Sequence, residues 1–313
     1  MHHEPPNPSE NAGLVIRAST GLVNLPEGVS PALDEIISRS LVHIQTSKAL
    51  AIRHRIGDYE LCAPDYQLVC ALAEDVRLTA EEALMRLLVA EKTWPTRIEN
   101  GRFKALSVDE ALPISSFPSI KGLIVESISC SNNRLTELDL SKFPNLTKLS
   151  CYLNELTELD LSHVPNLTML SCSENELGEL NLSRVPNLSV LLCDADDLNG
   201  LNLSEVPNLT KLSCSNNQLT ELDLSQVPNI TMLRCVGNQL AELDFSQVPN
   251  LKLLWCNGNQ ITELDIRNLQ NLTELWCNGN QITDLDIRSL QNLESLECDP
   301  ATRIIQRTDQ NFK

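Results

Sequence analysis

Apolar and polar positions repeat along the second half of the chain with a fixed period of 21 residues. A typical unit, LTKLSCSNNQLTELDLSQVPN, begins at Leu209 and follows the pattern LxxLxCxxNxLxxLDLSxVPN. In its first part, leucine and cysteine alternate with outward positions, as in a short β-strand with one buried face. The LDL segment repeats the alternation. Each unit therefore predicts two short extended pieces whose apolar side chains point inward.

Cysteine holds the same place in nine successive units, always 21 residues after the previous one. These residues are Cys130, Cys151, Cys172, Cys193, Cys214, Cys235, Cys256, Cys277 and Cys298. A unit this short cannot close a core alone, but stacked units bury continuous columns of leucine and cysteine. The sequence therefore predicts a solenoid whose neighbouring strands pair in parallel, about 4.8 Å apart.

Two polar columns accompany the apolar ones. Most units carry an asparagine three residues after the cysteine, namely Asn133, Asn154, Asn175, Asn217, Asn238, Asn259 and Asn280. Because an amide both donates and accepts, we expect these side chains to bond backbone groups of the adjacent turn. The serines from Ser141 to Ser246 that precede a proline by three residues are expected to cap tight turns.

The segment LxxLxCxxNxL resembles the signature of the leucine-rich repeat family, with cysteine in a slot that usually holds leucine. The unit length and the LDLS segment resemble the short bacterial class called IRREKO repeats, which is related in style to internalin-type repeats. The resemblance spans roughly residues 123–298. It implies an α/β-type repeat solenoid with a parallel β-sheet on a concave binding face and no long helix on the convex side. It does not by itself define a function.

The region before the repeats has helical spacing instead. Apolar residues indicate helices at 31–51, 64–75 and 79–92, and Thr79 with Glu82 forms a capping box for the third. The second and third helices could form a helix-turn-helix motif. That alternative is disfavoured because glutamates surround the few basic residues of the third helix, which is unsuited to phosphate contact.

An Asn-Gly pair between apolar positions predicts a β-hairpin near residues 98–106. Such a hairpin would begin the solenoid sheet and cover its otherwise open edge. The expected organisation is a disordered lead at 1–30, a helical cap at 31–122, the repeat solenoid at 123–298 and a C-terminal cap or tail at 299–313.

Charge narrows the range of partners. The chain has 24 Lys and Arg residues against 42 Asp and Glu residues, which gives a net charge of −18. This balance disfavours nucleic acid and anionic membranes and favours a basic protein partner. The N-terminus lacks the order of a signal peptide, and no apolar run is long enough to span a membrane. With eleven cysteines mostly in a regular series, we expect a bacterial cytoplasmic protein, and delivery into a host cell stays open.

The cysteine series and the acidic residues raise two chemical alternatives. Nine thiols in a row suggest a thiol-rich or metal-binding protein, but inward-facing cysteines between leucines are better interpreted as inert core residues. The acidic columns on the convex side are best interpreted as a solvated face. Weak cation-binding candidates cluster after Cys193, namely Asp194, Asp196, Asp197 and Asn199. We expect no cofactor.

The outward positions of the predicted strands carry the candidate partner site. Two tryptophans lie one unit apart there, and tryptophan and arginine are common anchors of protein interfaces. The predicted contact residues are Met232, Arg234, Leu253, Trp255, Glu274 and Trp276, with Tyr152 and Met169 as an extension. The tryptophans would supply buried area, and the arginine and glutamate would supply polar specificity.

The sequence shows no nucleophile beside a histidine and an acid, and no glycine-rich phosphate loop. The favoured hypothesis is therefore a non-enzymatic protein-interaction module, a scaffold or adaptor, that exists as a monomer or weak homodimer. Alternatives are a secreted effector that binds a host protein, and a cation-binding or thiol-rich protein.

Overall fold

The computed structural model divides the chain into two compact units, residues 1–49 and 50–313. The residues that the structure describes are 17–18, 21–22, 53–56, 59–89, 96–99, 102–109 and 123–307. In the first unit, β1 (Arg17–Ala18) pairs antiparallel with β2 (Gly21–Leu22). The helix predicted at 31–51 lies outside the described residues. The domain boundaries proposed from sequence stay a prediction, and the following paragraphs describe the second unit.

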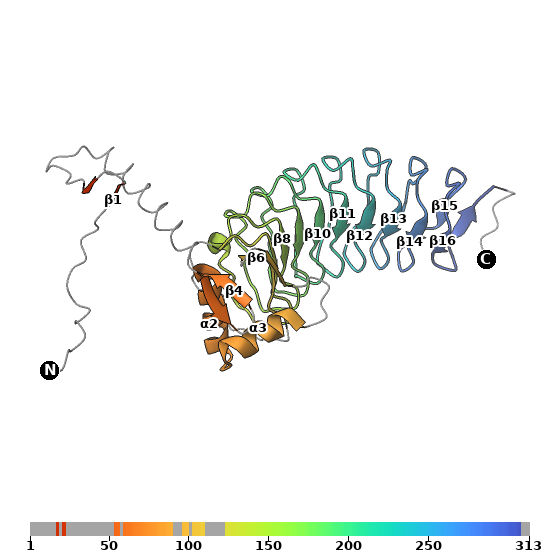
Figure 1. Cartoon of the computed structure of the whole chain (residues 1–313). Helices are drawn as coiled ribbons and strands as arrows, with labels where there is room; N and C mark the ends of the chain where they lie inside the picture. The colour runs from red at the N-terminus through yellow and green to blue at the C-terminus, as the bar shows by residue number, and fades with distance from the viewer. Residues whose placement is uncertain are drawn as a thin grey trace, which may run out of the picture. The chain divides into compact units, whose positions relative to one another are not determined.

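An 11-stranded sheet forms one side of this unit. Its strands are β5 (Arg97–Glu99), β6 (Arg102–Ser107), β7 (Ser127–Ser129), β8 (Lys148–Ser150), β9 (Met169–Ser171), β10 (Val190–Leu192), β11 (Lys211–Ser213), β12 (Met232–Arg234), β13 (Leu253–Trp255), β14 (Glu274–Trp276) and β16 (Ser295–Glu297). From β8 on, each strand pairs in parallel with the equivalent residues one unit later, as Leu149 pairs with Leu170. Figure 1 shows these strands side by side in chain order. The predicted parallel solenoid is confirmed.

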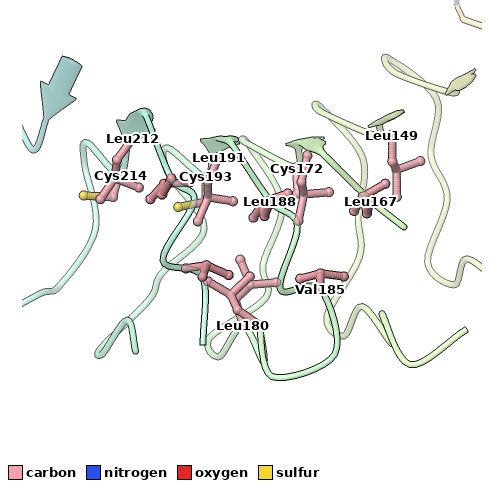
Figure 2. Close-up of a cluster of buried hydrophobic side chains, with 14 of the residues drawn as sticks. Leu149, Leu167, Cys172, Leu180, Val185, Leu188, Leu191, Cys193, Leu212 and Cys214 are labelled. Atoms are coloured by element: carbon pink, nitrogen blue, oxygen red, sulfur yellow. The ribbon is translucent and has the colours of Figure 1, made fainter. Parts of the chain in front are cut away.

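Leucine and cysteine fill the interior. The central leucine of each strand from β8 to β14 and the cysteine after it are buried, and the leucines and valines of the LDLS and VPN segments close the core opposite them. Figure 2 shows equivalent side chains of successive turns in rows, as for Leu191 and Leu212. The last cysteine is the exception to the predicted buried column: Cys298 is only partly buried, because β16 is the edge strand of the sheet.

The asparagine column forms a ladder of hydrogen bonds inside the stack, as predicted. In a typical turn, Asn238 Nδ2 donates to the carbonyl of Cys214 at 3.0 Å and to that of Cys235 at 3.1 Å. Its Oδ1 accepts from the N–H of Leu219 at 3.1 Å. One buried side chain thus satisfies three backbone groups on two successive turns, which fixes the spacing between them.

The tight turns on the opposite side of the solenoid correct the predicted role of serine. The aspartate two residues earlier makes the cap, as Asp160 Oδ1 accepts from the N–H of Ser162 at 2.8 Å. In the first such turn, Asp139 Oδ1 accepts both from the N–H of Ser141 at 3.0 Å and from Ser141 Oγ at 2.5 Å. A carboxylate or amide oxygen reaches the N–H two residues on without help from the serine, which explains the error. The 3-10 helix η1 (Leu140–Lys142) begins at that aspartate cap.

A helical cap precedes the sheet. The hairpin of β3 (Arg53–Ile56) and β4 (Tyr59–Cys62) leads into α2 (Ala63–Asp75), followed by α3 (Ala80–Val89). The predicted capping box of α3 is present, because Thr79 N–H donates to Glu82 Oε2 at 2.8 Å and Glu82 N–H donates to Thr79 Oγ1 at 3.2 Å. No helix in the described part of the chain is long and apolar enough to cross a membrane.

A buried ion pair joins this cap to the sheet. Arg102 Nε, at the start of β6, lies 2.5 Å from Asp65 Oδ2 in the first turn of α2. Asp65 Oδ1 also accepts from the N–H of Phe103 at 2.8 Å. Strands β5 and β6 pair antiparallel, as the Asn-Gly signal predicts, and β6 then pairs in parallel with β7. The hairpin therefore connects the helices to the first repeat.

The C-terminal part adds a short second sheet. Strand β17 (Arg303–Ile305) pairs in parallel with β15 (Asp284–Asp286), and Ile304 packs on the core. Arg303 Nε lies 2.5 Å from Asp284 Oδ1, which reinforces this pairing at the surface.

The ladder generates a prediction for stability. Replacing Asn238 by alanine leaves the buried N–H of Leu219 without its partner, and the carbonyls of Cys214 and Cys235 keep one donor each, from Asn217 and Asn259. Asn238→Ala should therefore lower the free energy of unfolding by about 2 kcal/mol. The exposed neighbour Gln239 provides the matched control, and Gln239→Ala should change it by less than about 0.5 kcal/mol. Denaturant titration of both variants measures this, and equal effects would show that the ladder does not stabilise the stack.

Candidate partner-binding site

The candidate site lies on the sheet face, which we define as the face of the 11-stranded sheet turned away from the core. The third residue of each strand forms a central column on this face. In the first repeats it consists of small buried serines, among them Ser150 and Ser171. From β12 on it changes to Arg234, Trp255 and Trp276, which are half-buried. The strand pairing places these three in register.

These three side chains form one continuous stack. The rings of Trp255 and Trp276 lie 4.1 Å apart between centroids and are inclined by only 1°. Arg234 Cζ lies 3.9 Å from the Trp255 ring centroid, which is cation–π geometry. Trp276 Nε1 lies 3.4 Å from Ser295 Oγ on the next strand. The tryptophans predicted to project outward therefore do so as a packed pair with Arg234 on one outer face.

Unpaired polar atoms gather at the same place. Four buried side-chain nitrogen or oxygen atoms among the described residues lack a hydrogen-bond partner in the protein, and three belong to Arg234, Trp255 and Asn257. They are the arginine Nε, the indole Nε1 and the asparagine Oδ1. Burying such atoms without partners is costly. This part of the sheet face is therefore not optimised for stability alone.

The other predicted contact residues fall into two groups. Met232, Leu253 and Glu274 are the first residues of β12, β13 and β14, so they flank the stack and are half-buried. Met169 lies on β9 and Tyr152 follows β8. With strands about 4.8 Å apart, three strand spacings, or about 14 Å, separate β9 from β12. Met169 and Tyr152 thus lie on the sheet side but apart from the stack.

Leu153 was missed by the sequence analysis. It is 40% exposed and adjoins Tyr152, which is 43% exposed. Its φ of 56° is left-handed, a conformation that is costly for a bulky residue. The same turn position holds glycine in later repeats, for example Gly237 and Gly258. A leucine in a column that favours glycine or asparagine was the available signal.

The weak cation candidates do not converge. Asp194 accepts from Ser213 Oγ at 2.7 Å on the neighbouring strand. Asp196 is fully buried, whereas Asp197 is exposed and accepts from Gln218 Nε2 at 3.2 Å. Asn199 is exposed and lines a groove on the opposite side of the solenoid. Among the described residues, no group of three or more His, Cys, Asp or Glu side chains is arranged to hold a metal ion.

Asp196 lies inside the stack of turns and not at the surface with Asp197. It occupies the asparagine column inside the stack, where its Oδ1 accepts from the N–H of Asn175 at 2.9 Å. The pKa of Asp196 is raised to about 7, chiefly by burial and also by the charges of Asp194 and Asp197, against the opposing effect of the hydrogen bond from Asn175. A carboxylate here cannot donate to backbone carbonyls as the asparagines do.

The thiols of the cysteine column are poorly suited to chemistry. Burial raises the thiol pKa in the eight buried repeat cysteines, from Cys130 to Cys277, and brings that of Cys277 to about 12. The thiolate is the nucleophile and metal ligand, so these groups are poorly reactive near neutral pH. All eleven cysteines are free.

The parallel sheet, the buried leucine and cysteine columns and the asparagine ladder define a leucine-rich repeat solenoid. A family model described as leucine-rich repeats in two copies matches residues 207–248 and residues 249–288. No curated protein shows a significant sequence match. The repeats are leucine-rich repeats, and the solenoid is consistent with the internalin-like class of bacterial proteins. Repeats of this kind support a protein-interaction module.

Solved structures give the same result. A functional domain of InlJ from Listeria monocytogenes, which includes a cysteine ladder, is 28% identical, with a TM-score of 0.54 over 72% of this chain and 52% of that one. The present chain thus spans about half of that structure. Internalin C2 from the same organism is 19% identical, with a TM-score of 0.54 over 74% of this chain and 92% of its own. A leucine-rich repeat protein of Leptospira interrogans is 20% identical, with a TM-score of 0.55 over 77% and 70%. The last two likenesses concern the fold alone.

The buried carboxyl group predicts a pH-dependent effect of one substitution. Between about pH 4 and pH 7 the unfolded chain releases the Asp196 proton before the folded chain does, so this group lowers stability progressively as pH rises, and the loss is complete above about pH 7. Asp196→Asn, which restores the side chain of the other turns, should therefore raise the melting temperature more at pH 8 than at pH 5. Thermal unfolding at both pH values measures this. A gain of equal size at both would contradict a buried carboxyl group that titrates near neutral pH.

Proposed function

We propose that this chain is a non-enzymatic protein-interaction module, a scaffold or adaptor, that binds a protein partner on the sheet face of its solenoid. The site is the stack of Arg234, Trp255 and Trp276 with the flanking residues Met232, Leu253 and Glu274. Tyr152 and Met169, together with the exposed Leu153, form a second contact region toward the N-terminal end of the sheet.

The observation that carries this proposal is the half-buried stack with its unpaired polar atoms. Indole rings stacked at 4.1 Å, with a guanidinium 3.9 Å from the Trp255 ring, restrict one another, so a partner would order few side chains on binding. Tryptophan and arginine dominate the binding energy of many interfaces. Arg234 Nε and Trp255 Nε1 are already buried without a hydrogen-bond partner. A bound protein that supplies acceptors there would satisfy them at little further desolvation cost.

The described histidines support a binding role over catalysis. His54 stacks on Tyr66 in the cap, with ring centroids 4.6 Å apart, and His163 is exposed on the turn after an LDL segment. His163 adjoins Ser162 and Asp160, but Ser162 is hydrogen-bonded directly to Asp160, which is not the serine–histidine–acid order that acyl transfer needs. The poorly reactive thiols of the repeat column point the same way.

The remaining properties belong to the proposal as well. A net charge of −18 favours a basic partner and disfavours nucleic acid or an anionic membrane surface. Free cysteines throughout fit a reducing bacterial cytoplasm. The protein would act as a monomer or weak homodimer without a cofactor. Delivery into a host cell would use the same face for a host partner.

Affinity capture from a lysate of the source organism tests the proposal. A partner retained by the wild-type chain should be held at least about thirtyfold more weakly by the Trp255→Ala/Trp276→Ala variant, because two central anchors are lost. The control variant Glu221→Ala/Glu242→Ala changes exposed residues on the opposite side and should retain the partner. Circular dichroism must show that both variants fold. Equal capture by the tryptophan variant would move the site to the cap or to the opposite side.

A further inference from the structure

Charge is unevenly distributed along the stack. Lys211 on β11 and Arg234 on β12 lie at one end, whereas Glu274 on β14 and Glu297 on β16 lie at the other. The two indole rings separate the two ends. We call this run of side chains, from β11 to β16, the charged strip. In a chain with a net charge of −18, a cationic end on the sheet face stands out from the average surface.

None of these four charged residues forms an ion pair with another residue of the described part of the chain. On the opposite side, by contrast, Arg267 pairs with Asp265 at 2.6 Å and Arg288 with Asp286 at 2.7 Å. The repeats can thus pair charges locally but do not do so on the strip.

Two further carboxylates adjoin the strip and are already engaged. Asp194 accepts from Ser213 Oγ and from the N–H of Ser215. Asp299 accepts from the N–H of Gly279 at 2.9 Å and from that of Asn280 at 3.2 Å. Both keep their charge, but neither forms an ion pair with a residue of the strip.

The two ends of the stack also differ in what covers them. Arg234 occupies the outer face of Trp255, but no described aromatic ring or cation lies on the outer face of Trp276. The residue paired with Trp276 on β16 is Glu297, which is exposed. A cationic side chain placed there would stack on an indole and face a carboxylate at the same time.

From this geometry we infer that the partner contributes a polypeptide segment with three parts in order. An acidic side chain pairs with Arg234 and Lys211, an apolar stretch covers the tryptophan edges with Met232 and Leu253, and a basic side chain lies on Trp276 against Glu297 and Glu274. This inference rests on the proposed function and specifies the partner's chemistry. Arg234 and Glu297 are three strand spacings apart, so the two charges of the partner lie about 14 Å apart.

A displayed library of random twelve-residue peptides, selected on the full-length protein, tests this inference. Binders should depend on the Trp255→Ala/Trp276→Ala change and should carry one acidic and one basic residue on either side of an apolar stretch. For a synthesised binder, Arg234→Glu and Glu297→Lys should each raise the Kd by about tenfold, because each places like charges together. Glu221→Lys on the opposite side is the matched control and should leave the Kd within about twofold.

Charge-swap rescue makes the assignment specific. Changing the acidic residue of the peptide to lysine should restore binding to the Arg234→Glu variant, and changing its basic residue to glutamate should restore binding to Glu297→Lys. If each altered peptide rescues only its own protein variant, the order of the charges along the strip is established. Fluorescence of Trp255 and Trp276 gives the titration signal.

Failures of the two proposals have different signatures. Tryptophan-dependent binders that are uniformly basic, and that bind the Arg234→Glu variant as well or better, would overturn the charge order and leave the proposed function standing. A selection without any tryptophan-dependent binder would count against both. A concentration-dependent dimer in light scattering that the tryptophan variant abolishes would place a second copy of the chain on the strip instead.

Discussion

The structure depends on the asparagine ladder that runs inside the stack of turns. A 21-residue unit with three-residue strands makes few backbone hydrogen bonds within itself, so its remaining polar groups need partners on neighbouring turns. One amide per turn supplies two donors and an acceptor at the required places, as Asn217 does through Cys193, Cys214 and Leu198. With the turns fixed at that spacing, the leucine and cysteine columns form a continuous buried core, and the sheet face presents its side chains in register. The position of every residue of the proposed site follows from this register.

The ladder also explains why the chain tolerates so few kinds of interior residue and so many kinds of exterior one. A larger side chain at Leu191 would press against Leu170 and Leu212 on the two neighbouring turns, so it would overpack the column. Asp196 shows the limit from the polar side, because its carboxylate keeps an acceptor in the ladder but lacks the two N–H donors of an asparagine. Outward positions meet no such constraint. Variation in the outward column is therefore the place where function can differ without changing the fold.

The sequence predicted the repeating parts well because each prediction was made several times over. The period, the parallel pairing, the inward cysteines and the asparagine bonds all depend on averages over many equivalent turns. Features that occur once were predicted less well. To predict that Asp196 is buried and that Leu153 is exposed with a left-handed backbone, one has to know the column in which each residue lies. One also has to know the burial and the backbone conformation that the column imposes. The serine cap was wrong because the aspartate two residues earlier offers a better acceptor to the same N–H.

The site itself could be predicted only in part, and the reason is physical. Alternation places Trp255 and Trp276 on the outward side, but it cannot say whether two outward rings stack on each other or lie apart. The in-register parallel pairing decides this, since it brings equivalent side chains within about 5 Å of each other. The same pairing sets Arg234 on the ring and leaves Glu297 opposite the other ring. If all repeats were identical, each outward column would hold a single residue type. In this column the residue changes from serine to arginine, tryptophan and glutamate within four turns. That change makes the two ends of the column chemically different along the solenoid axis. A partner that recognises the column must therefore have two different ends and bind in one orientation.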